Sequence, residues 1–120
     1  MRAVGFYEYG PAHVLQVLDL PELNAGQGEV RVKVYAAAIN PTDILSRTGA
    51  RRAPMGKTDA YANKQIADCP PYVPGMDIAG IVDQVGDGVD TGVNVGDSVV
   101  AMVVPKGAHG GYRHQIVLKA

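Results

Sequence analysis

The sequence predicts a mainly β domain, a partly open β-barrel with one or two short helices. The prediction rests on three features of the chain. Val30, Val32 and Val34 alternate with charged or polar neighbours, the pattern of a half-buried strand. Other short apolar runs are separated by turns, and 15 residues are glycine. The clearest helix start follows Asn40, and the run after it is short.

The first third of the chain is expected to form strands joined by turns. A strand over residues 2–9 leads to a Gly-Pro turn, and a second short strand over 15–20 is ended by a proline. A turn over residues 24–28 precedes the alternating strand, which is expected to cover residues 30–39.

The helix after this strand has start and stop signals in its own residues. Asn40 is a good N-cap, and Pro41 falls at the first helical position, where its missing N–H costs nothing. Asp43, three residues after the cap, suits a capping box, and Gly49 can end the helix in a left-handed conformation. A strand that delivers polar side chains to a helix N-terminus is a good place for a ligand. It is also a common structural joint.

Residues 50–71 differ from the rest of the chain in composition and lack its regular hydrophobic pattern. They contain three prolines and scattered charges but no sustained period, which predicts a long surface excursion with one weak helical turn over 61–66. A solvated insertion explains this composition best, although its cations could also bind phosphate. The cations are Arg51, Arg52, Lys57 and Lys64.

Three more strands are expected in the second half, over residues 78–85, 98–104 and 112–118. Gly80 interrupts the first of them and indicates a bulge or a close backbone approach. The run 98–104 is almost continuously apolar, which predicts a buried strand.

Composition excludes several classes of function. The net charge of −1 gives no reason to expect nucleic acid or an anionic membrane as a partner. Cys69 is the only cysteine, so an internal disulfide and a multi-cysteine zinc site are excluded. No apolar run approaches the ~20 residues of a membrane helix, and the start lacks the apolar core of a signal peptide. A cytosolic (cytoplasmic) protein is expected.

The residues show no self-contained active site by spacing alone. The glycines of residues 86–92 miss the dinucleotide-binding spacing by one residue, and a strand is expected where that motif needs a helix. The cluster therefore predicts a turn. His13, His109 and His114 have no spaced metal-ligand partners, and no serine lies in a nucleophile elbow.

Four motifs in a fixed order nevertheless resemble one known family. They are INPTD at residues 39–43, VPGMDIAG at 73–80, VGD at 95–97 and GGY at 110–112. The chain resembles the N-terminal, GroES-like catalytic domain of the medium-chain dehydrogenase/reductase superfamily, and most of all its zinc-free quinone oxidoreductase branch. The resemblance covers nearly all of residues 1–120 as one domain, and the longer excursion at 50–71 is the departure from it.

The resemblance implies that no zinc is bound. The zinc-dependent members carry a cysteine where this chain has Asn40, and a histidine and a glutamate where it has Met76 and Asp77. The four-cysteine structural lobe is also absent. A site without thiolate or imidazole loses most of its expected affinity for zinc.

The resemblance also implies an activity. Its members transfer hydride from NADPH to quinones or α,β-unsaturated carbonyls (enones), in a cleft between this domain and a following Rossmann domain. Asn40 would face the cofactor with Thr42 beside it, and these two are the candidate catalytic and cofactor-binding residues. A tyrosine of some relatives is Leu45 here. The remaining motif residues are expected to be caps and turns: Asp43, Gly75, Asp77, Gly96 and Asp97.

The Rossmann units that would hold NADPH are absent from these 120 residues. The chain alone is therefore not expected to be a competent reductase, and the resemblance allows a homodimer of the full-length parent. The alternative is a stand-alone GroES-like β-barrel that acts as a binding or assembly module, as in co-chaperonins. Such a module needs a mobile loop with an apolar docking tripeptide, whereas residues 50–65 are polar and basic. The NPTD and PGMD motifs favour the reductase.

Overall fold

The computed structural model describes residues 1–50 and 68–120. Within these ranges the chain forms six strands, one α-helix and one 3-10 helix, and the mainly β prediction is confirmed. In chain order the elements are β1 (Arg2–Gly5), η1 (Ala12–Val14), β2 (Gln16–Asp19), β3 (Glu29–Ala36), α1 (Pro41–Thr48), β4 (Asp77–Val85), β5 (Ser98–Met102) and β6 (Gln115–Lys119).

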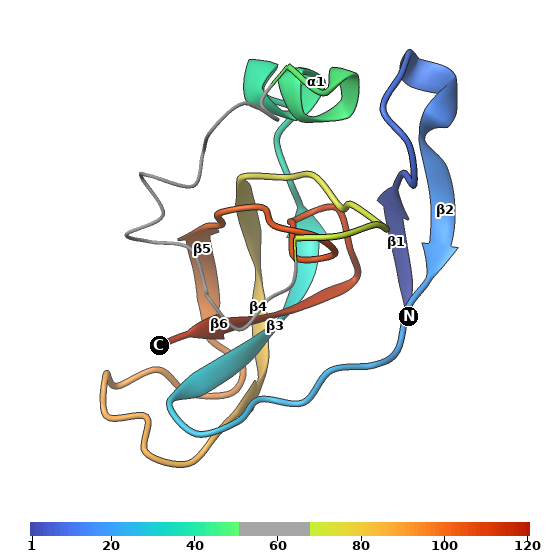
Figure 1. Cartoon of the computed structure of the whole chain (residues 1–120). Helices are drawn as coiled ribbons and strands as arrows, with labels where there is room; N and C mark the ends of the chain where they lie inside the picture. The colour runs from blue at the N-terminus through green and yellow to red at the C-terminus, as the bar shows by residue number, and fades with distance from the viewer. Residues whose placement is uncertain (51–67) are drawn as a thin grey trace.

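The strands form two antiparallel sheets. Four strands lie in the order β5-β4-β3-β6, and β1 pairs with β2 in a separate two-stranded sheet. Figure 1 shows α1 at one end of the larger sheet and the connection between β4 and β5 at the other end. The two sheets do not close into a barrel within the described residues, so the fold is partly open, as predicted.

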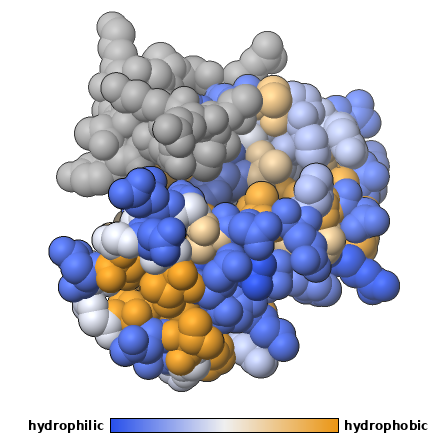
Figure 2. Space-filling model, turned by 90° about the horizontal axis from the view of Figure 1, so that it is seen from below, coloured by the Kyte–Doolittle hydropathy of each residue, from blue (hydrophilic) through white to orange (hydrophobic). Residues whose placement is uncertain are grey.

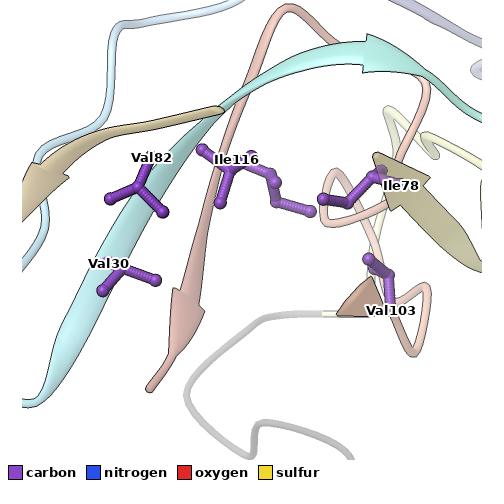
Figure 3. Close-up of a cluster of buried hydrophobic side chains, with 6 residues drawn as sticks. Val30, Ile78, Val82, Val103 and Ile116 are labelled. Atoms are coloured by element: carbon purple, nitrogen blue, oxygen red, sulfur yellow. The ribbon is translucent and has the colours of Figure 1, made fainter. Parts of the chain in front are cut away.

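The larger sheet carries the main core on one face. Val30 and Val32 of β3, both buried, pack with side chains of β4 and β6 and with a residue just after β5. Figure 3 shows the members of this cluster pointing toward one another from these separate segments. They are Val30, Val32, Ile78, Val82, Val103 and Ile116. The alternation read from the sequence of β3 is therefore confirmed for its first half.

The smaller sheet is joined to the larger part by backbone hydrogen bonds. The N–H of Val4 donates to the carbonyl of Tyr112 at 2.8 Å, and Phe6 and Tyr72 exchange two bonds of 2.9 and 2.8 Å. A second core cluster forms at this junction from Ala3, Leu18 and Val73. The segments before β4 and before β6 are thus positioned against β1.

Five strands, β1, β2, β3, β5 and β6, are shorter than the sequence predicts. β1 ends at Gly5, because from Phe6 onward the chain leaves β2 and reaches the end of α1, where the Gly10 N–H donates to the Arg47 carbonyl at 3.0 Å. β3 ends at Ala36, since its pairing with β4 stops there. The last strand begins at Gln115.

The prediction of a buried strand over residues 98–104 is wrong. Among the described residues, β5 is an outer strand of its sheet and pairs only with β4, so its side chains alternate between the core and the surface. Val100 and Met102 are each 83% exposed, and only Val103, just beyond the strand, is fully buried. Figure 2 shows the end of the molecule opposite α1, where hydrophobic side chains gather on one side of a largely hydrophilic face.

Gly80 is a close-approach point, as predicted. A Cβ atom there would collide with the Lys33 carbonyl oxygen, and the register between β3 and β4 shifts beside it, between Val34 and Ala36. The excursion expected over residues 50–71 and its weak helical turn at 61–66 lie largely or wholly outside the described residues. None of the helices in the described ranges is long and apolar enough to cross a membrane.

Candidate functional site

An open cleft of about 960 Å³ lies where β3 runs into α1. Its lining comes from the connection between these elements, from the first residues of β4 and from β5. Most of the lining is apolar and includes three consecutive alanines at 36–38 and exposed side chains of β5. Asn40, Thr42 and Asp77 are the polar residues among those that line it in the described chain. The cleft therefore offers apolar walls with a few polar groups, which is typical of a small-molecule site.

Asn40 stands at the head of α1 in the predicted N-cap role. Its backbone is extended (φ −111°, ψ 156°), and it forms a capping box with Asp43. The backbone N–H of Asn40 donates to Asp43 Oδ2 at 2.8 Å. Pro41 occupies the first helical position, and Gly49 ends the helix with φ 83°, as predicted. The local sequence thus places Asn40 at the N-terminus of α1, where it lines the cleft.

Asp43 does more than cap the helix. Only 5% of the residue is exposed, and its carboxylate also accepts the Gly75 N–H at 2.9 Å and the Tyr112 hydroxyl at 3.0 Å. These two partners lie 32 and 69 residues further along the chain. A buried carboxylate is tolerated where several donors surround it. Asp43 therefore joins α1 to the segments before β4 and before β6.

Tyr112 is a part of this site that the sequence analysis missed as a functional contact. Its hydroxyl also donates to the Ala38 carbonyl at 3.2 Å, so it contacts a residue that lines the cleft. Burial, the hydrogen bond to Asp43 and the negative charges of Asp43 and Asp77 raise the pKa of Tyr112. The tyrosine thus stays protonated and works as a hydrogen-bond donor. The GGY motif contained this residue, but nothing local indicated its partner.

Asp77 lies at the start of β4 and faces the connection between β3 and α1. Its Oδ1 accepts the Ala38 N–H at 2.9 Å, and its Oδ2 lies 3.4 Å from Asn40 Nδ2. The expectation that Asp77 is only a cap or turn residue needs correction, because it contacts a candidate site residue directly. Gly75, Gly96 and Asp97 keep the expected turn roles, with φ of 110° and 96° at the two glycines and an Asn94 N–H bond to Asp97 at 2.9 Å.

The structure brings the two predicted site residues into one cleft. Asn40 and Thr42 both line it, two positions apart across the start of α1. Met76 and Asp77, which stand at the zinc-ligand positions of the resembling family, line the same cleft. The glycine cluster at 86–92 does not form a dinucleotide-binding turn, because the connection between β4 and β5 contains no helix.

The donor set of the cleft does not fit zinc. A carboxamide, a thioether and a single carboxylate stand where zinc sites use thiolate, imidazole and carboxylate. No group of three or more histidine, cysteine or acidic side chains within residues 1–50 and 68–120 could hold a metal ion. Cys69 is exposed and has no disulfide partner.

Residues 26–119 match the family model for the alcohol dehydrogenase GroES-like domain. The chain belongs to this family. Its relatives place the GroES-like domain in the quinone oxidoreductase branch of the medium-chain dehydrogenase/reductase superfamily, as the motifs implied.

Two curated relatives illustrate the similarity. The chain is 33% identical over 110 residues to quinone oxidoreductase of Rattus norvegicus. This alignment covers 91% of this chain and 29% of the relative. It is 36% identical over 113 residues to a chloroplastic NADPH-dependent alkenal/one oxidoreductase of Arabidopsis thaliana, covering 92% of this chain and 25% of the relative. The chain therefore spans less than a third of either relative.

The fold is likewise shared with solved oxidoreductases. The quinone oxidoreductase of Escherichia coli, determined in complex with NADPH, superposes with a TM-score of 0.73 at 26% identity. The superposition covers 99% of this chain and 31% of that protein. The quinone oxidoreductase of Coxiella burnetii gives a TM-score of 0.78 at 27% identity, covering 99% of this chain and 34% of that protein.

Proposed function

We propose that this chain is the substrate-side domain of an NADPH-dependent oxidoreductase that reduces quinones or α,β-unsaturated carbonyls without zinc. The observation that carries the proposal is the cleft at the start of α1, where Asn40 and Thr42 are set among apolar walls. Relatives support the substrate class, because they include quinone oxidoreductases and an alkenal/one oxidoreductase that is NADPH-dependent. The structure of a similar enzyme with NADPH supports the cofactor.

The chemistry divides between the cofactor and the domain. When bound, the reduced nicotinamide supplies a hydride to the electrophilic acceptor. As the acceptor takes this hydride, negative charge develops on its carbonyl oxygen, and a proton from water completes the reduction. Asn40 and Thr42 both line the cleft, so an N–H of the Asn40 carboxamide would stabilise that charge and the Thr42 hydroxyl would assist it. The alanines and the β5 side chains would hold a flat apolar acceptor by apolar contact.

The proposal that the reaction needs no zinc rests on the side chains of Asn40, Met76 and Asp77, which together do not form a zinc site. Quinones and enones are electrophilic enough to be reduced with hydrogen-bond polarisation alone, so a Lewis acid is not needed. We expect metal analysis of the dialysed protein to find no stoichiometric zinc. About one zinc per chain would contradict this part of the proposal.

The decisive experiment measures NADPH oxidation with 1,4-benzoquinone and with a simple enone. The protein is produced as the full-length product of its gene, and Asn40→Ala is compared with the unmodified protein. Loss of a polarising hydrogen bond typically lowers kcat by about 10²–10³. We expect a fall of at least about tenfold in kcat/KM, while loss of the cap costs only about 0.5–2 kcal/mol of stability.

Asn94→Ala is the matched control, because Asn94 is an exposed asparagine in a surface turn and bonds only to nearby backbone and to Asp97. It should leave kcat/KM unchanged. If the unmodified protein oxidises no NADPH with either acceptor, the proposed function is wrong. An Asn40→Ala variant with full activity would remove Asn40 from the mechanism.

A further inference from the structure

The side chain of Asp77 continues the pairing of β3 with β4 beyond the last residue pair. The ladder between these strands ends at Ala36 and Ala79. Two residues later, the Ala38 N–H donates to Asp77 Oδ1 at 2.9 Å. The carboxylate thus holds the connection that leads from β3 to α1, directly before the candidate site residue Asn40.

The other oxygen of the same carboxylate orients the Asn40 carboxamide. Asp77 Oδ2 lies 3.4 Å from Asn40 Nδ2. An ionised carboxylate only accepts hydrogen bonds, so the nitrogen end of the amide, and not its oxygen, must face Asp77. The capping box holds the side chain on the side of the helix N-terminus. One N–H of the carboxamide is left for a ligand.

The two acidic residues around Asn40 have separate tasks. Asp43 accepts the backbone N–H of Asn40 at 2.8 Å and is buried, so it sets where the helix begins. Asp77 is only half-buried and contacts the side chain of Asn40. The ion pairs of the described residues do not include Asp77. Its carboxylate instead accepts hydrogen bonds from two neutral donors, the Ala38 N–H and the Asn40 carboxamide. The ion pairs are Met1–Asp19, Arg31–Asp83 and Lys119–Glu29.

We propose that Asp77 is a positioning residue that fixes the Asn40 carboxamide with one N–H available to the carbonyl oxygen of a ligand in the cleft. The identity of this ligand rests on the proposed function, whereas the positioning itself does not. Asp77 touches no reacting atom in this proposal. It acts through Asn40, and its loss should have no effect where Asn40 is already absent.

The positioning is tested first on the 120-residue chain without any ligand. In amide-resolved NMR spectra, the two Nδ2 protons of Asn40 are assigned by their loss in Asn40→Ala. Asp77→Asn keeps the size of the side chain but replaces the charged acceptor, so we expect these two resonances to shift. Asp97→Asn changes an exposed turn carboxylate and should leave them in place. Unshifted Asn40 resonances in Asp77→Asn would overturn the proposal.

The consequence for the reaction is tested by a double-mutant cycle in the full-length product of the gene. Small displacements of a positioned group can lower a rate by up to about 10²-fold. We expect Asp77→Asn to lower kcat/KM for 1,4-benzoquinone by about tenfold in the unmodified background and not at all in Asn40→Ala. Losses that multiply in the double variant would overturn the proposal. An unmodified protein without turnover would instead contradict the proposed function, and the NMR result would then decide the positioning alone.

Discussion

At the scale of single residues, Asp43 connects α1 with two distant segments of the chain. Its carboxylate accepts three hydrogen bonds, from the Asn40 N–H, the Gly75 N–H and the Tyr112 hydroxyl. The Gly75 bond is buried, and the other two are partly buried. Removing one acceptor would therefore leave several donors without a partner, and each buried orphan costs about 1–3 kcal/mol.

We predict that Asp43→Ala lowers the free energy of unfolding by about 3 kcal/mol, because the Gly75 N–H and the Tyr112 hydroxyl lose their acceptor. Urea denaturation of the 120-residue chain measures the change. Asp97→Ala is the control, since Asp97 accepts the Asn94 N–H in an exposed turn, and it should cost less than about 1 kcal/mol. Equal losses for the two variants would show that the buried network adds nothing.

His109 makes the stability of the domain depend on pH. Burial lowers the pKa of His109 from 6.5 to about 4, and the nearby positive charge of Arg113 acts in the same direction. The folded state therefore binds fewer protons than the unfolded chain between these two values. Stability should be fully present above about pH 6.5 and be lost progressively as the pH falls toward about 4, by up to about 3 kcal/mol.

Denaturation midpoints between these pH values measure the effect, and His109→Gln should remove this component of the pH dependence. His114→Gln is the control, because His114 is exposed and should leave the dependence intact. If the pH dependence is unchanged in His109→Gln, it arises from other titratable groups and the prediction is wrong.

At the scale of elements, the four-stranded sheet distinguishes strands that look alike in sequence. β4 lies between two neighbours, and its Val82 is completely buried. β5 is an outer strand, and its Val100 is 83% exposed although the surrounding run is equally apolar. The position of a strand in the sheet, rather than its composition, decides how much each valine contributes to stability.

The same substitution in the two strands tests this difference. Thr has the shape and strand preference of Val but carries a hydroxyl in place of one methyl group. Val82→Thr should cost about 2 kcal/mol of unfolding free energy, because the hydroxyl is buried in an apolar core. Val100→Thr should change it by less than about 0.5 kcal/mol. A large loss for Val100→Thr, measured in the same urea titration, would mean that β5 is covered in solution.

At the scale of the whole molecule, we propose that the domain provides one side of a ligand site. The cleft is open, and the chain matches 29% and 25% of the lengths of the two curated relatives described above. Dinucleotide sites depend on a glycine turn and a helix N-terminus that bind the pyrophosphate. The glycine cluster of residues 86–92 is not followed by a helix, so it does not provide one.

We therefore predict that the 120-residue chain binds NADPH only weakly, in the millimolar range that corresponds to roughly −4 kcal/mol. Isothermal titration calorimetry measures the affinity, and the same titration with the full-length product of the gene is the comparison. Micromolar binding by the short chain would reveal a dinucleotide site within these residues.

The sequence by itself determined the features that depend on a few neighbouring residues. The start and end of α1 follow from Asn40, Pro41 and Asp43 and from Gly49, which act within one or two helical turns. The mainly β class and the close approach at Gly80 were also predictable, because alternation and an isolated strand glycine are local patterns. The two candidate site residues were chosen through the family resemblance and lie in one cleft.

Only the tertiary structure decided which distant residues meet. Asp77 contacts Asn40 across 37 positions, and Tyr112 contacts Asp43 across 69. These contacts depend on the register of β4 against β3 and on the packing of the segment before β6, which no local pattern records. The exposure of β5 has the same origin, since an apolar run is buried only where the sheet order gives it two covered faces. Local chemistry determines an element, whereas its neighbours determine what its side chains can do.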